Sequence, residues 1–100
     1  MNLTIENNAN GILAHVEGRL DTINAPLFGK MMLPLLEGDT PIIKLDCSGL
    51  EYIASSGLRL LLTLQKSVTA RKGELTLTGL RPDIKAVFDM TRFSSIFKIE

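Results

Sequence analysis

The chain has 100 residues, of which 45% are hydrophobic, and its 11 basic residues balance 11 acidic ones. A chain of this size and composition can bury one core, and a zero net charge without a basic stripe argues against nucleic-acid binding. Cys47 and His15, each the only residue of its type, can form neither a disulfide nor a metal site. No secretory signal or membrane span is predicted, so we expect a cytoplasmic protein without a cofactor.

Two strands joined by a turn are predicted at the start of the chain. Residues 3–6 and 11–20 have the strand pattern, and the Asn- and Gly-rich stretch between them is typical of a turn. Apolar and polar residues alternate along the second strand, and His15 falls on its polar side. We interpret His15 as an ordinary edge or surface residue of that strand rather than as a catalytic base.

A helix is predicted next. Apolar residues recur there at helical spacing, namely Leu27, Phe28, Met31, Met32, Leu35 and Leu36. Asn24 is placed to cap this helix, Pro26 suits its first turn, and Gly38 is a natural stop. Pro34 removes one backbone hydrogen bond and pushes Leu33 out of helical geometry, so we expect a kink or an early end near Leu33.

The middle of the chain combines a buried strand with the clearest helix. Residues 41–50 form a nearly continuous apolar run, as expected for a strand in the interior of a sheet. Cys47 lies near the end of this run, where a small buried thiol is favoured over a nucleophile. Residues 56–72 predict a helix that Gly73 ends. Its single polar sector contains Arg59, Thr63, Lys66 and Ser67.

Three further elements complete the chain. Residues 74–80 alternate as a strand, Pro82 opens a third helix, and residues 95–100 predict a last strand. The order of elements is therefore β-β-α-β-α-β-α-β. Strands separated by helices imply right-handed crossovers and a largely parallel α/β sheet, here in one domain over residues 1–100.

The sequence contains no catalytic constellation. There is neither a G-x-S-x-G elbow nor a glycine-rich loop of the kind that cradles phosphates. Asp21 and Asp46 are a conceivable acid and base, but a carboxylate at a strand end more often fixes a loop or caps a helix. We therefore do not expect an enzyme.

Two hydroxyls and a glycine stand where the buried strand gives way to the long helix. In a purely structural interpretation, Ser55 is the N-cap, Ser56 is the first helical residue and Gly57 allows close packing. The same place suits a second use, because a phosphate on a hydroxyl there meets free N–H groups and the positive end of the helix dipole. The residues alone leave both interpretations open.

Three stretches of the chain resemble the STAS-domain anti-sigma factor antagonists of bacteria. They are residues 18–26, 44–62 and 73–99, which together cover nearly the whole sequence. The most specific part is the Asp-x-Ser-x-Leu turn that starts at Asp46, followed by Ser-x-Gly-Leu from Ser55. The resemblance implies the STAS fold, a mostly parallel mixed sheet with about three helices in a single STAS domain.

The resemblance also implies a partner switch that regulates transcription. Unmodified family members bind an anti-sigma factor that is also a serine kinase, which frees the sigma factor. The kinase phosphorylates a serine at the start of the helix, matched here by Ser55, and a serine phosphatase restores it. Asp21 matches a family residue beside that serine. The residues expected to bind the partner are Asp21, Ser55, Ser56, Gly57 and Arg59.

The chain departs from the family pattern at one position, and two other functions are known for proteins that it resembles. Many antagonists have Asp immediately before the phosphorylated serine, whereas this chain has Ala54. Some stand-alone STAS domains are accessory subunits of a transporter ATPase, and others bind small ligands such as nucleotides. Neither of these alternatives requires phosphorylation.

Overall fold

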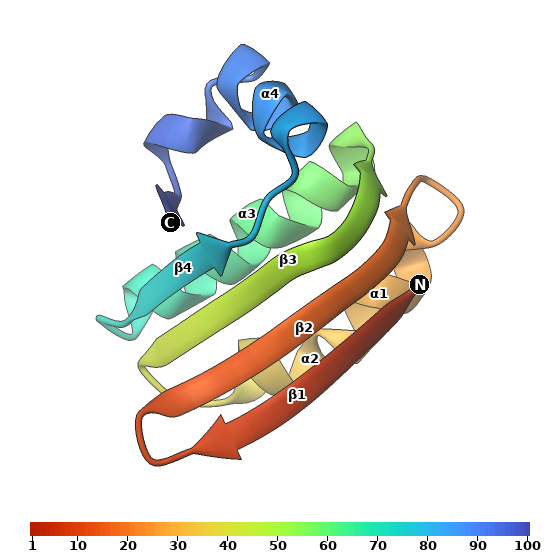
Figure 1. The fold of residues 1–100 in the computed structure, drawn as a ribbon. Helices are drawn as coiled ribbons and strands as arrows, with labels where there is room; N and C mark the ends of the chain where they lie inside the picture. Colours follow the sequence, from red (N-terminus) through yellow and green to blue (C-terminus); the bar gives the residue numbers. More distant parts are fainter.

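Five strands form one sheet in the computed structural model, which describes all 100 residues. The strands are β1 (Asn2–Asn8), β2 (Gly11–Leu20), β3 (Ile42–Ile53), β4 (Glu74–Thr78) and β5 (Lys98–Ile99), and they lie side by side in that order (Figure 1). β1 and β2 form an antiparallel hairpin, and each later neighbour is parallel. The predicted mostly parallel mixed sheet is therefore confirmed.

Four α-helices and one 3-10 turn connect the strands. They are α1 (Ala25–Met31), α2 (Leu33–Glu37), α3 (Ser55–Ala70), α4 (Pro82–Met90) and the 3-10 turn η1 (Phe93–Ser95). α1, α2 and α3 lie on one face of the sheet, behind it in the view of Figure 1. None of these helices is both long and apolar enough to cross a membrane.

The core lies between that face of the sheet and the helices. The strands supply every second side chain, and the buried ones include Ile12, Ala14, Val16, Ile43, Leu45, Leu75 and Leu77. α3 contributes Leu58, Leu61, Leu64 and Val68, whose spacing of three and four residues keeps them on one side of the helix. The other side chains of the strands point to the face of the sheet that α1, α2 and α3 leave uncovered.

Pro34 divides the first predicted helix into two. α1 ends at Met31, and α2 starts at Leu33 with Pro34 in its first turn, where the missing N–H costs no hydrogen bond. The expected break near Leu33 is confirmed, and it raises the number of α-helices from about three to four. The last predicted strand is shorter than expected, because the chain first forms η1 and only Lys98–Ile99 pair with β4.

Candidate functional site

The start of α3 is one residue earlier than predicted, so the expected N-cap role of Ser55 is wrong. Ala54 is the N-cap: its backbone is extended, at φ −97° and ψ 169°, and its carbonyl oxygen accepts the first helical bond, from the N–H of Leu58 at 3.0 Å. Ser55 is then the first helical residue, and no side chain caps the helix. The N–H groups of the first turn keep no intrahelical partner, so this end still favours a negative charge.

The two serines differ in access to solvent. Ser55 is exposed, whereas the hydroxyl oxygen of Ser56 is buried and has no hydrogen-bond partner. Gly57 is also buried, as its predicted packing role requires, because a Cβ there would lie 2.5 Å from Cγ of Leu20. Of the two hydroxyls, only that of Ser55 is open to an enzyme or a partner.

One backbone hydrogen bond places the end of β2 beside the start of α3. The N–H of Ala54 donates to the carbonyl oxygen of Leu20 at 2.9 Å, and Asp21 follows Leu20 directly. The Asp21 carboxylate accepts the backbone N–H of Asn24 at 2.8 Å, which confirms that it fixes a loop. This loop, residues 21–24 between β2 and α1, is the Asp21 loop. Asn24 occupies the N-cap position of α1, but its side chain makes no cap bond, so the predicted cap is wrong. Its side-chain amide N–H donates to the carbonyl oxygen of Arg19.

Exposed apolar and basic side chains lie close in the sequence to Asp21 and Ser55. Ile23, in the turn after β2, is 87% exposed, and Leu27 on α1 is 50% exposed. Tyr52, three residues before Ser55, has the guanidinium of Arg19 stacked 4.5 Å above its ring. Large apolar side chains that stay in contact with water are candidates for contact with another protein.

The remaining candidates from the sequence lie elsewhere. Cys47 is buried and unpaired as predicted, and burial raises the pKa of its thiol to about 12. Arg59 and Lys66 are exposed on α3, one and three turns from Ser55. Nowhere in the chain do three His, Cys, Asp or Glu side chains come together in an arrangement that could hold a metal ion.

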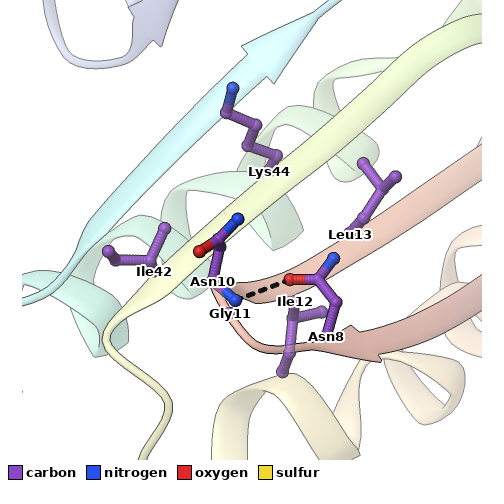
Figure 2. A pocket seen from close by; sticks show the side chains of 7 residues that line it. All are labelled: Asn8, Asn10, Gly11, Ile12, Leu13, Ile42 and Lys44. Carbon is purple, nitrogen blue, oxygen red and sulfur yellow. Dashed lines mark hydrogen bonds between the residues drawn. The ribbon is translucent and has the colours of Figure 1, made fainter.

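A small pocket lies at the opposite end of the sheet from Ser55. It has a volume of about 190 Å³ and is formed by the β1–β2 turn and the start of β3 (Figure 2). Asn8, whose side-chain oxygen accepts the N–H of Asn10 at 2.9 Å, holds the turn that forms one side of it. Its lining brings together none of the residues that the sequence predicted to be functional.

The side chain of His15 is 31% exposed on the uncovered face of the sheet, so its predicted surface position is confirmed, but its predicted place on an edge strand is wrong. β2 lies between β1 and β3, so His15 is not on an edge strand, and its ring contacts carboxylates from both neighbouring strands. The two carboxylates are nine and 31 residues away in the sequence, and no local pattern marks the contact. Only the register of the three strands brings these residues together.

The family becomes clear from comparison with known proteins. The family model described as the STAS domain matches residues 2–100. The chain belongs to this family. Its sheet of one hairpin and three parallel neighbours, with α3 starting directly after β3, is thus a STAS fold.

Two relatives have similar sequences over almost their full length. BtrV of Bordetella bronchiseptica, named as a candidate anti-sigma factor antagonist, is 32% identical over 100 residues, which are 99% of this chain and 85% of BtrV. The anti-sigma-B factor antagonist of Bacillus subtilis is 26% identical over 99 residues, 99% of this chain and 90% of the relative.

Solved structures share the fold at lower identity. An anti-sigma factor antagonist from Mycobacterium paratuberculosis is 18% identical with a TM-score of 0.87, over 98% of this chain and 83% of that one. The unphosphorylated form of the antagonist SpoIIAA is 19% identical with a TM-score of 0.79, over 99% and 88% of the two chains. At these identities the comparison establishes the fold of the STAS domain and nothing finer.

Proposed function

We propose that this protein is an anti-sigma factor antagonist whose activity is switched off by phosphorylation of Ser55. The observation that carries the proposal is the exposed hydroxyl of Ser55 at an uncapped helix N-terminus, held beside the Asp21 loop by the bond from Ala54 to Leu20. The names of two relatives support the antagonist role. SpoIIAA, which shares the fold, has also been solved in a phosphorylated form.

The partner in this proposal is a cytoplasmic anti-sigma factor with serine kinase activity. It binds the unmodified protein through the surface made by Asp21, the start of α3 and Arg59, and thereby releases its sigma factor. Exposed Ile23, Leu27 and Tyr52 extend that surface with apolar area, which supplies most of the driving force in protein association.

Phosphorylation changes this surface by charge. The kinase transfers the terminal phosphoryl group of ATP to Oγ of Ser55, the hydroxyl proton is lost and ADP leaves. The product has about 1.5 to 2 negative charges at neutral pH. The free N–H groups of α3 stabilise the phosphate, so the helix keeps its structure while the partner meets a dianion. A serine phosphatase hydrolyses the phosphate and resets the protein.

The deciding experiment is affinity capture from the protein's own cells with three forms of the chain. The unmodified protein and Ser55→Ala should both capture an ATPase of the histidine-kinase type, whereas Ser55→Asp should capture much less of it. The captured kinase and ATP should then phosphorylate the unmodified protein but not Ser55→Ala.

Two outcomes would contradict the proposal. Capture of a transporter ATPase, equally by all three forms, would indicate the accessory-subunit function. Capture of the kinase with equal affinity by Ser55→Asp would show that charge at this position does not control the partner.

A further inference from the structure

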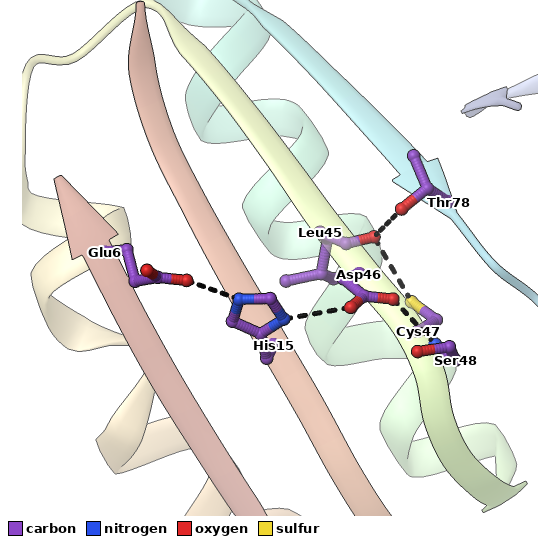
Figure 3. A network of polar contacts seen from close by, with 7 residues as sticks. All are labelled: Glu6, His15, Leu45, Asp46, Cys47, Ser48 and Thr78. Carbon is purple, nitrogen blue, oxygen red and sulfur yellow. Dashed lines mark hydrogen bonds and ion pairs between the residues drawn. The ribbon is translucent and has the colours of Figure 1, made fainter. Parts of the chain in front are cut away.

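Three neighbouring strands each contribute one ionisable side chain to a single cluster on the uncovered face of the sheet. Glu6 comes from β1, His15 from β2 and Asp46 from β3, and the imidazole lies between the two carboxylates (Figure 3). Nδ1 of His15 is 2.9 Å from Oδ2 of Asp46, and Nε2 is 2.5 Å from Oε2 of Glu6. The side chain of His15 is 31% exposed, so protons exchange freely with solvent.

With both carboxylates ionised, the two contacts require a proton on each ring nitrogen. A neutral imidazole has one N–H and one lone pair, so it could donate to only one carboxylate and would turn its lone pair toward the other. We propose that Glu6, His15 and Asp46 form a proton-binding site that clamps β1 and β3 onto β2 when the ring is charged and loosens when the ring is neutral. This inference goes beyond the proposed function and involves the opposite face of the sheet from α3.

The other charged groups around the ring do not change the conclusion that the imidazole is charged. A shallow pocket of about 260 Å³ is lined by His15, Asp46 and Glu17, and Glu17 on β2 adds negative charge to it. Lys44 on β3 is the nearest cation along that strand, and its ammonium group is directed to Glu100 at 3.9 Å. On β4 the residue in register with Asp46 is Thr78, which carries no charge. Arg81, just before α4, is a further cation, and its Nε donates to the carbonyl oxygen of Ser48 at 3.2 Å. The two groups in contact with the ring are both carboxylates, which favour the imidazolium.

The cluster is also connected to the bend in β3 that precedes Ser55. Oδ1 of Asp46 accepts the backbone N–H of Ser48 at 3.0 Å, and the pairing of β2 with β3 shifts register just beyond His15. This N–H, together with the bond from His15, lowers the pKa of Asp46. One carboxylate therefore holds both the imidazole and the irregular part of the strand.

The direction in which the stability of the clamp changes with pH follows from the protonation of the His15 ring. Hydrogen bonds to Asp46 and Glu6 raise the pKa of His15 above its ordinary value of 6.5. The clamp should therefore contribute its full stability below about pH 6.5, where the ring is charged in both folded and unfolded chains, as long as both carboxylates remain ionised. This contribution is lost as the pH rises through the raised pKa of the folded protein.

The test is an NMR titration of the full chain, in which the single histidine gives one unambiguous set of imidazole signals. We expect a His15 pKa above 6.5 in the wild type and a lower pKa in both Glu6→Gln and Asp46→Asn. Glu74→Gln is the matched control, because it removes an exposed carboxylate of β4 that pairs with Lys98 instead. This control should leave the pKa of His15 unchanged.

The same samples test the clamp itself. Hydrogen exchange of the β1 amides should become faster as the pH passes the His15 pKa, beyond the intrinsic base catalysis measured in His15→Gln. The Ser48 amide signal should move with the same midpoint. A His15 pKa at or below 6.5 in the wild type would overturn the proposal, as would β1 exchange with the same pH profile in His15→Gln. A Ser48 signal that does not follow the His15 midpoint would overturn the link to the β3 bend.

Discussion

Gly57 and Leu20 are in such close contact that a Cβ on residue 57 would lie 2.5 Å from Cγ of Leu20. Leu20 is fully buried and is also the residue whose carbonyl oxygen binds the N–H of Ala54. The end of β2 and the first turn of α3 are therefore packed together without space between them. This contact fixes the position of Ser55 relative to the Asp21 loop.

We expect Gly57→Ala to destabilise the protein although alanine favours helices. The methyl group must displace the branch point of a buried leucine, and overpacking of this kind costs about 1 to 3 kcal/mol. The gain in helix propensity is about 1 kcal/mol at most, so the net loss of stability reaches up to about 2 kcal/mol. Chemical denaturation should show a lower free energy of unfolding.

Gly29→Ala is the matched control for this substitution. Gly29 lies within α1, and a Cβ there would meet Cδ2 of Leu60 at 3.6 Å, an ordinary contact. This variant should be as stable as the wild type or more so. Equal effects of the two substitutions would show that the contact between Gly57 and Leu20 does not constrain the helix.

The phosphate should be found on Ser55 and not on Ser56. Both are serines in the first turn of α3, but the hydroxyl of Ser56 is buried, and a kinase would have to open the helix to reach it. Fragmentation of the phosphopeptide in a mass spectrometer distinguishes the two positions. Ser56→Ala should be phosphorylated normally and Ser55→Ala should not, and the reverse result would reject the assignment.

A negative charge at position 55 should weaken binding without unfolding the protein. A coupling of about 3 kcal/mol, at the upper end of the usual range, corresponds to an affinity about 150-fold lower. Ser55→Asp and Ser55→Ala should have the same circular dichroism, and only Ser55→Asp should lose affinity in calorimetry with the captured kinase. Loss of affinity in Ser55→Ala as well would point to the hydroxyl, and not the charge, as the important group.

Arg59 should affect how fast the partner binds. It is exposed on the polar side of α3, one turn after Ser55, and is placed to meet acidic groups of the partner. Arg59→Glu should slow association and reduce its dependence on salt. Lys72→Glu, the same charge reversal just past the end of α3, should have a smaller effect. Equal association rates for Arg59→Glu and the wild type at low salt would show that Arg59 is an exposed residue without a contact to the partner.

The main helices and strands could be predicted from the sequence because the spacing of apolar residues matches the side chains that are buried in the core. Pro34 predicted the division between α1 and α2, since the effect of a missing N–H is local. The start of α3 was misplaced by one residue because serine is a common N-cap and alanine is not. The contacts of His15 could not be predicted, because the register of three strands determines them and no short pattern encodes register.

Ala54 stands where many antagonists of this family have aspartate. Because Ala54 is the N-cap, an aspartate there can accept an N–H of the first turn and should stabilise the unmodified protein by about 0.5 to 2 kcal/mol. Its charge would also oppose a phosphate on Ser55. Two unit charges ~6 Å apart repel by ~3 kcal/mol at an effective dielectric of ~20, and exposure to solvent reduces this value.

Even a third of that repulsion is most of one pKa unit, since a unit corresponds to about 1.4 kcal/mol. Ala54→Asp should therefore raise the second pKa of phosphorylated Ser55, which the helix N-terminus otherwise lowers below about 6. Ala54→Ser is the matched control, because it provides a cap without a charge and should leave that pKa near the wild-type value. Phosphorus NMR titration measures the second pKa of the phosphate in the wild type and in both variants. If Ala54→Asp and Ala54→Ser have the same second pKa, the charge at the N-cap does not act on the phosphate, and the two side chains do not share a surface.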